Sequence, residues 1–246
     1  MDPLDLLARS ELFAGASAAD FGPLARSAVT RRYLRGDLIW GAGDQADTIF
    51  LVLAGEVVVS RIGPDGEEYV IELYTVGDVV GQLHLFEPAP TRMLDARSVD
   101  ATDCWVVPGR AFAELLEKSP KLMKLMLRTY SRWIRVRDLR NADSSFRNVE
   151  GQVATNLLHL ADRFGEASHA GVRIRVHVTE TTLANMIGAS RENVSRAIAK
   201  LSRAGDLHRD NGTFLLARPE DLRRRYSWVS DEEARYTRSK QNRSSG

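Results

Sequence analysis

The sequence predicts an α+β fold in which an N-terminal antiparallel β-roll is followed by a long helix and a C-terminal winged helix-turn-helix domain. Three observations predict this order. Short β-rich segments between closely spaced glycines occupy residues 29–108, an apolar helical stripe begins at Pro120, and residues 178–205 have the pattern of helix, turn and helix. Because 246 residues exceed a typical single domain, two domains are expected.

The apolar period changes where the predicted roll begins. Residues 1–27 have the 3.6-residue period of short helices, and from Val29 the period becomes two. The predicted strands include residues 48–53, 56–60 and 70–74. The Gly63-Pro64-Asp65-Gly66 sequence marks a hairpin turn, and residues 110–118 return to a helical pattern. Many short strands with regular turn signals are typical of an antiparallel sandwich or barrel.

A long helix is predicted from Pro120, a residue that is well tolerated at the first helical position. Its apolar positions are Leu122, Leu125, Met126, Tyr130, Trp133, Ile134, Val136 and Leu139. This stripe is longer than one small domain needs, so we expect the helix to pair with the same helix of a second copy. The alternative is a helix packed wholly against its own β-domain. Residues 141–145 are polar and break the pattern, which predicts a hinge there.

Residues 178–205 carry the most informative pattern in the chain. Thr179 is a candidate N-cap before an apolar helix, Gly188 supplies the turn, and Ser190 caps a second helix. The residues of the second helix that we expect to be buried are Val194, Ile198 and Leu201. A helix over residues 149–164 precedes this motif, and two short strands around Asn211-Gly212 follow it as a predicted wing.

The opposite face of the second helix is equipped to contact DNA. It carries Arg191, Glu192, Ser195 and Arg196. Arginine pairs bidentately with guanine, and glutamate accepts a hydrogen bond from cytosine. The alternative is that these charges only solvate a surface helix. The candidate DNA-binding residues are Thr179, Thr181, Ser190, Arg191, Glu192, Ser195 and Arg196.

The charge is balanced over the whole chain but not within it. There are 34 Lys+Arg against 33 Asp+Glu in total, whereas residues 151–246 hold 16 basic against 11 acidic residues and the remainder holds 18 against 22. The basic part contains the helix-turn-helix, as contact with phosphates requires. With no apolar run as long as a membrane span and no basic region of a signal peptide at the N-terminus, we expect a cytoplasmic protein that binds no membrane.

Several classes of site are not expected. The single cysteine, Cys104, excludes a disulfide within the chain and a cysteine-ligated zinc or iron–sulfur site. The five histidines lack metal-ligand spacing, and the sequence has neither a catalytic constellation nor a glycine-rich phosphate loop of the nucleotide-hydrolase type. We therefore expect no metal ion and no enzymatic activity.

Two stretches resemble the cyclic-AMP receptor protein/FNR (CRP/FNR) family of bacterial transcription regulators, within a similarity that extends over residues 5–220. Residues 188–196 are similar to its recognition-helix signature, and residues 77–86 followed by Arg92 look like the phosphate-binding cassette of its β-roll. The resemblance implies a cyclic-nucleotide-binding-like sensor domain (1–118), a dimerisation helix and hinge (119–145), a winged helix-turn-helix domain (146–222) and a polar tail (223–246). It also implies a homodimer that binds double-stranded DNA at a palindrome with TGTGA-like half-sites, under allosteric control by an effector at the roll, with RNA polymerase as partner.

The sensor half departs from the cyclic-AMP-binding pattern of the family. Gln82 stands where such members have glutamate, and Met93 replaces a hydroxyl residue beside the phosphate arginine, Arg92. An alignment without gaps brings Arg137 and Asp138 to the nucleotide side of the long helix. The candidate effector-binding residues are Gly81, Gln82, Leu83, Arg92, Met93, Arg137 and Asp138.

Several effectors remain open. They are cyclic AMP; cyclic di-GMP, whose guanine Arg137 and Asp138 would suit; haem at His84; a redox signal at Cys104; and no small ligand at all. A different class of function is a cyclic-nucleotide sensor whose C-terminal half docks on a protein partner.

Overall fold

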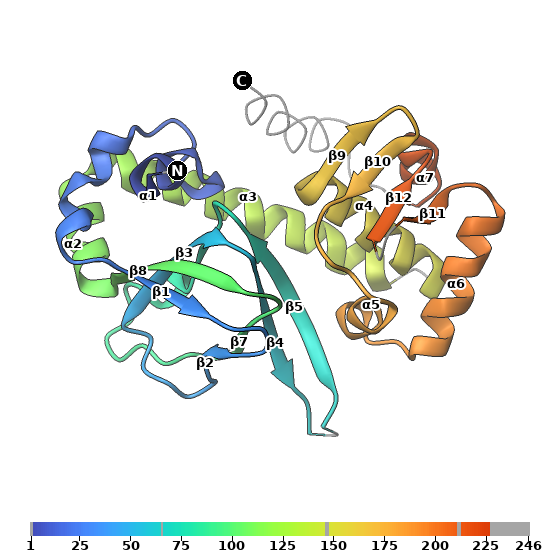
Figure 1. Ribbon diagram of the computed structural model, residues 1–246, viewed down its shortest axis with the longest axis horizontal. Helices are drawn as coiled ribbons and strands as arrows, with labels where there is room; N and C mark the ends of the chain where they lie inside the picture. The colour runs from blue at the N-terminus through green and yellow to red at the C-terminus, as the bar shows by residue number, and fades with distance from the viewer. Residues whose placement is uncertain (1, 65, 146–147, 211–212, 227–246) are drawn as a thin grey trace. The chain divides into compact units, whose positions relative to one another are not determined.

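The computed structural model describes residues 2–64, 66–145, 148–210 and 213–226, and the chain divides into two compact units, residues 1–134 and 135–246 (Figure 1). Each unit is described by itself. Among the sequence-based expectations, the side chains of Val136 and Leu139, the Asn211-Gly212 turn and the tail from residue 227 lie outside the described residues.

The first unit consists of two antiparallel four-stranded sheets and the helices around them (Figure 1). Its helices are α1 (Pro3–Arg9), the 3-10 helices η1 (Glu11–Phe13), η2 (Ala18–Arg26) and η3 (Gln82–His84), α2 (Gly109–Lys118) and α3 (Pro120–Ser145). Its strands are β1 (Val29–Tyr33), β2 (Leu38–Trp40), β3 (Thr48–Ala54), β4 (Glu56–Ile62), β5 (Glu68–Thr75), β6 (Val79–Val80), β7 (Asp95–Ser98) and β8 (Thr102–Pro108). The sheets have the orders β1-β8-β3-β6 and β2-β7-β4-β5. The predicted antiparallel β-roll is confirmed.

Strand β3 is buried on both faces, which explains its unbroken apolar sequence. Phe50 and Val52 belong to a core that also contains residues of the second sheet, whereas Ile49 and Leu51 belong to a core shared with the N-terminal helices, α2 and α3. Because successive side chains of a strand point to opposite faces, a strand between two cores is apolar at every position.

The stripe of α3 is only partly as expected. Leu122 and Met126 are buried in the core shared with the N-terminal helices. The Thr129 hydroxyl donates to the main-chain oxygen of Glu11 at 3.2 Å. Much of the stripe therefore packs within its own unit, while Leu127 and Ile134 are 57% and 61% exposed on another face.

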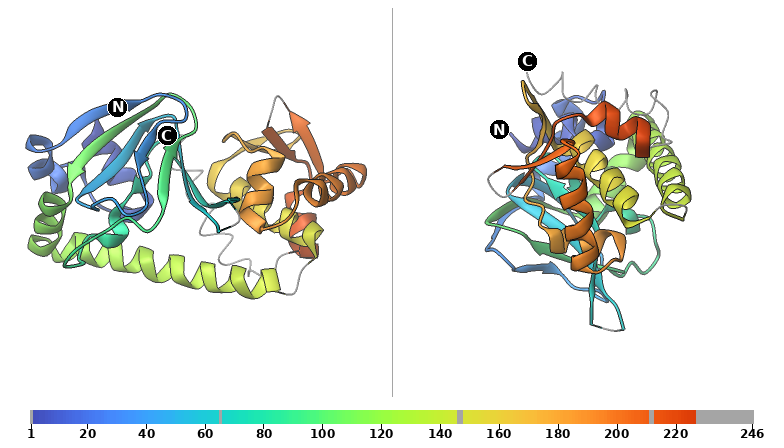
Figure 2. Two further views of the ribbon diagram at one scale, coloured as in Figure 1. Left: turned by 90° about the horizontal axis from the view of Figure 1, so that it is seen from below. Right: turned by 90° about the vertical axis from the view of Figure 1, so that its right-hand side faces the viewer.

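The predicted break at residues 141–145 is wrong, because α3 continues through Ser145 as one helix (Figure 2, left). Polar residues have only modestly lower helix propensity than apolar ones, so the loss of an apolar period does not by itself end a helix. Within the described residues, no helix combines the length and the apolar character needed to cross a membrane.

The second unit is built on α4, which packs against α5, α6 and α7. Its elements are α4 (Val149–Phe164), β9 (Gly165–Ser168), β10 (Gly171–Ile174), α5 (Glu180–Ile187), α6 (Arg191–Arg203), β11 (Leu207–Asp210), β12 (Thr213–Leu216) and α7 (Pro219–Tyr226). The strands form one antiparallel sheet in the order β11-β12-β10-β9 (Figure 1). The predicted helices and the two wing strands are confirmed, and strands β9 and β10 were not expected.

The polar tail does not begin at residue 223. Residues 223–226 are the last turn of α7, and Arg223 is buried there, with its terminal nitrogens 2.6 and 2.9 Å from the carboxylate oxygens of Asp162. Three consecutive arginines suggest a solvated segment in the sequence. One of them is instead paired with α4, a contact that no local pattern reveals.

Candidate functional site

Two capped helices and a left-handed glycine build the helix-turn-helix. The Thr179 side chain accepts a hydrogen bond from the Thr182 backbone at 3.0 Å, and the Ser190 side chain accepts one from the Asn193 backbone at 3.3 Å. Between the helices Gly188 has φ 65° and ψ 37°, a conformation that is unfavourable for residues with a Cβ. The caps and the turn lie where the sequence predicts them.

The two faces of α6 differ sharply. Val194, Ile198 and Leu201 are buried, and α6 packs against α4 and α5. Of the seven candidate DNA-binding residues, Ser195 is half-buried and the other six are exposed, with the Arg191 side chain 74% exposed. Since burial fixes the inner face, the outer face is presented on a rigid helix. The structure brings the candidate residues together along α6 and the start of α5.

Two arginines at this surface are already engaged. The Arg196 guanidinium donates to the side-chain oxygen of Asn193 one turn earlier. The Arg191 Nε lies 3.9 Å from a carboxylate oxygen of Glu180, and the other oxygen of Glu180 is paired with Arg209 of β11. Glu180 was not among the residues expected from the sequence, because its partners lie 11 and 29 positions further along the chain.

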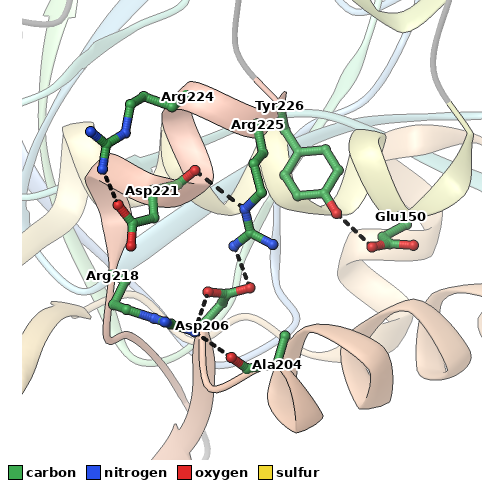
Figure 3. Close-up of polar contacts among 8 residues, drawn as sticks. All are labelled: Glu150, Ala204, Asp206, Arg218, Asp221, Arg224, Arg225 and Tyr226. Carbon is green, nitrogen blue, oxygen red and sulfur yellow. Dashed lines mark hydrogen bonds and ion pairs between the residues drawn. The ribbon is translucent and has the colours of Figure 1, made fainter.

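Behind α6, a buried carboxylate organises the end of the unit. Asp206 is fully buried, and its oxygens lie 3.0 Å from Arg218 and 2.5 Å from Arg225 (Figure 3). Arg218 also donates to the main-chain oxygen of Ala204, directly after the last residue of α6. These contacts join the end of α6 to α7.

A second set of ionic contacts links three helices of the same unit. The carboxylate of Glu150 on α4 lies 2.5 Å from the Lys200 ammonium of α6 and accepts a hydrogen bond from the Tyr226 hydroxyl of α7 at 2.5 Å (Figure 3). Lys200 and Tyr226 hold the pKa of Glu150 below its usual value, although burial acts in the opposite direction. The orientation of α6 is thus fixed by charge as well as by its apolar face.

In the first unit, the cassette residues surround a buried cation. Arg92 is only 3% exposed, and its terminal nitrogens donate to the main-chain oxygens of Gly81 at 2.9 Å and Thr48 at 2.5 Å. Its guanidinium lies 4.4 Å from the ring centre of Trp40. Burial lowers the pKa of Arg92, while the carboxylates of Asp47 and Asp44 act in the opposite direction.

Arg92 retains capacity for a further acceptor. Its Nε is buried and makes no hydrogen bond with any described residue. Gly81 has φ 88°, and a Cβ there would lie 2.7 Å from an Arg92 nitrogen, so the backbone can approach the guanidinium only as glycine. The cassette therefore holds a positive charge whose partners are neutral carbonyls and ring faces.

The other cassette candidates differ in exposure. Gln82 is buried at the start of η3, whereas Leu83 and Met93 are exposed. The main-chain oxygen of Gln82 lies 3.5 Å from the Tyr130 hydroxyl of α3. The structure thus brings Gly81, Gln82 and Arg92 together, with Leu83 and Met93 at the surface beside them in sequence.

Arg137 and Asp138 have exposed side chains on α3, past the point where the chain divides into its two units. Their expected part in effector binding stays a prediction. Trp133, the neighbouring position of the same alignment, donates its indole N–H to the carboxylate of Glu11 at 3.2 Å, so it serves the packing of the N-terminal segment.

The two residues considered for haem and redox sensing have ordinary environments. His84 lies 3.0 Å from the carboxylate of Glu87. Cys104 is fully buried on β8, and burial raises the pKa of its thiol to about 12, which keeps it protonated and unreactive. No group of three or more potential metal ligands occurs among the described residues.

The comparisons with known proteins agree with this two-part organisation. Residues 30–119 match the family model of the cyclic nucleotide-binding domain, and residues 151–225 match that of the Crp-like helix-turn-helix domain. The CRP-like cAMP-activated global transcriptional regulator of Mycobacterium tuberculosis is 28% identical over 221 residues, which cover 90% of this chain and 98% of that protein. The cAMP-activated global transcriptional regulator Vfr of Pseudomonas aeruginosa is 28% identical over 190 residues, covering 76% and 88%.

Solved structures show the same fold. The c-di-GMP responsive global regulator CLP of Xanthomonas campestris has a TM-score of 0.67 at 23% identity, covering 81% of this chain and 99% of that one. FixK2 from Bradyrhizobium japonicum has a TM-score of 0.70 at 19% identity, covering 82% and 98%. A cyclic nucleotide-binding fold joined to a helix-turn-helix defines a class of DNA-binding transcription regulators. The chain belongs to the CRP/FNR family of that class.

Proposed function

We propose that this protein is a homodimeric, sequence-specific regulator that binds a palindrome with TGTGA-like half-sites through α6. The observation that carries the proposal is the contrast between the two faces of α6, one buried and one presenting Arg191, Glu192 and Arg196 to solvent. Arginine and glutamate on the first turns of a recognition helix match the donors and acceptors of G·C pairs in the major groove. We place this function in the cytoplasm, with RNA polymerase as the protein partner.

A second copy of the chain is the proposed occupant of the free face of α3. Leu127 and Ile134 lie seven residues apart and are both exposed, with the small Ser131 between them. Large apolar residues at this spacing form the seam of paired helices. Two copies related by a two-fold axis would present two copies of α6, as a palindrome requires.

The proposed effector is a cyclic nucleotide whose phosphate is held by Arg92. The residues present fit a phosphate, because Arg92 is a buried cation with an unpartnered Nε and no hydrogen bond to a carboxylate among the described residues. Gly81 lets the backbone approach the same position, and the buried Gln82 offers an amide to the sugar. Binding an anion here would compensate the buried charge.

Cyclic AMP is the first candidate, since the relatives from Mycobacterium tuberculosis and Pseudomonas aeruginosa bear names that describe activation by cAMP. Cyclic di-GMP is the second, because Arg137 and Asp138 could offer guanine both a donor and an acceptor. Whichever ligand binds, it must favour the DNA-competent state by its differential affinity, and DNA must tighten its binding by the same factor.

The proposal is tested with purified full-length protein in three measurements. Sedimentation of wild type and I134D should give a dimer and a monomer, respectively. Selection from a randomised duplex library should enrich a palindrome. Calorimetric titration with cyclic AMP, cyclic GMP and cyclic di-GMP, repeated with the enriched duplex, should show that one ligand binds and that DNA strengthens its binding. A monomeric wild type, or a library without enrichment, would refute the proposal.

A further inference from the structure

Glu180 occupies an unusual position in the DNA-facing part of the second unit. It is the first residue of α5, directly after the N-cap Thr179, and its side chain is only 16% exposed. One carboxylate oxygen lies 3.9 Å from the Nε of Arg191 on α6, and the other is paired with Arg209 on β11. A single anion therefore joins the start of α5, the first residue of α6 and the wing.

The two arginines remain largely open to solvent, with side chains 74% and 58% exposed. Arg209 is restrained a second time, because its guanidinium lies 5.7 Å from the ring centre of Phe214 on β12. Exposed ion pairs are weak, so either arginine can be exchanged onto another anion at small cost. Glu180 thus restrains both arginines without immobilising them.

A carboxylate at such a surface works against binding to DNA of any sequence. It repels the phosphates, and it neutralises one of the two positive charges that it holds. A bidentate contact between Arg191 and a base edge is more favourable than a contact with a phosphate, because it satisfies the whole guanidinium fork. The ion pairs consequently weaken non-specific contacts more than they weaken the specific one.

We propose that Glu180 is a specificity-determining positioning residue, which holds Arg191 and Arg209 in ion pairs so that contact with phosphates alone does not release them. The inference rests on the proposed function, because it assigns Arg191 to base contact. It assigns to Glu180 a role in discrimination between correct and incorrect DNA, and a role in orienting the wing arginine.

The test compares wild type with E180Q, using a scrambled duplex and the duplex that wild type enriches from a randomised library. E180Q should bind the scrambled duplex about threefold to tenfold more tightly at low salt, and the slope of log K against log [salt] should steepen by about 1 to 2. The ratio of specific to non-specific affinity should fall by a similar factor. E166Q is the matched control, because Glu166 on β9 also lies 3.9 Å from an arginine, Arg175, and should leave slope and ratio unchanged.

The interpretation does not depend on perfect folding of the variant, since unfolding cannot raise affinity. In an R209A background the effect of E180Q should shrink; if it persists in full, Glu180 acts as a bare charge and the holding role is wrong. Unchanged affinity of E180Q for the scrambled duplex would likewise overturn the inference. A wild type that enriches no sequence would refute the proposed function, whereas the scrambled-duplex measurement would still decide whether Glu180 restrains the arginines.

Discussion

The two units of this protein bury opposite charges and compensate them differently. In the first unit Arg92 is 3% exposed and donates to the main-chain oxygens of Gly81 and Thr48. In the second unit Asp206 is fully buried and lies between the guanidinium groups of Arg218 and Arg225 (Figure 3). The buried anion has two cations from its own chain, whereas the buried cation has only dipoles and aromatic rings within hydrogen-bonding or stacking reach.

This difference separates a structural charge from a charge suited to a ligand. A buried ion pair with good geometry is complete, and removing one partner leaves the other uncompensated. A buried cation served by neutral groups is incompletely compensated, so an incoming anion gains more from it. Asp206 therefore serves the integrity of the second unit, and Arg92 is available to an effector.

The largest effect is expected for R92L. Loss of the guanidinium should weaken binding of the effector by about 3–5 kcal/mol, more than 100-fold, because a desolvated charge–charge contact disappears. Calorimetric titration measures this loss. The free energy of unfolding without effector should not fall, since a buried cation without a bonded carboxylate is replaced by an apolar side chain. R92K, which keeps the charge but not the fork, should lie between the two, and wild-type affinity in R92L would remove Arg92 from the site.

The next largest effect is expected for D206A, which leaves Arg218 and Arg225 facing each other without an anion. Because both arginines are about half exposed, we expect a decrease of about 2–3 kcal/mol in the free energy of unfolding, less than for a fully buried pair. Denaturant titration followed by circular dichroism measures it. D221A removes the exposed partner of Arg224 on the same helix and should leave the midpoint unchanged. Equal midpoints for D206A and wild type would contradict the comparison.

A smaller effect is expected for R191A at the exposed surface. It should cost about 1–3 kcal/mol of discrimination at one base pair of the half-site, because one bidentate contact is lost. Competition binding with single-base variants of the selected duplex measures this cost. R175A removes another exposed arginine of the same unit and should not change base preference. A uniform loss over all sequences would instead identify Arg191 as a phosphate contact.

The smallest effect is expected for the exposed pair of Asp20 and Lys121, which lie 2.7 Å apart. The hydrogen bond from Lys121 and then that from the Ser17 backbone lower the pKa of Asp20 from 3.8 to about 2. The stabilisation is therefore complete above about pH 4 and is lost as the pH falls toward 2. D20N should lower the unfolding midpoint slightly at pH 7, and the difference from wild type should shrink below pH 4. A difference that does not depend on pH would assign the effect to something other than this charge.

Local patterns predicted most of the second unit. The bounds of α4 are those expected, and Thr179, Gly188 and Ser190 occupy the cap and turn positions because capping depends only on neighbours within a few residues. Strands β9 and β10 have four residues each, too short for an alternating pattern to be distinguished from a loop. The sequence therefore showed the wing but not the sheet to which it belongs.

What the sequence could not show depends on pairs that lie far apart along the chain. Glu180 meets Arg209, and Arg223 meets Asp162, only after folding. The cassette residues were predicted through resemblance, yet that resemblance did not indicate that Arg92 bonds to the main chain of Gly81 and Thr48. The apolar stripe of α3 likewise indicated a long buried face without separating the part that packs within its own unit from the exposed Leu127 and Ile134.

The burial of Cys104 has a practical consequence for measurements of motion. It is the only cysteine of the chain, and a thiol with a pKa near 12 does not react with maleimides at neutral pH. A cysteine introduced at the exposed Ala199 of α6 would then carry a spin label alone, with no background from the rest of the chain. In a homodimer the two labels would report the spacing of the recognition helices directly, before and after an effector is added.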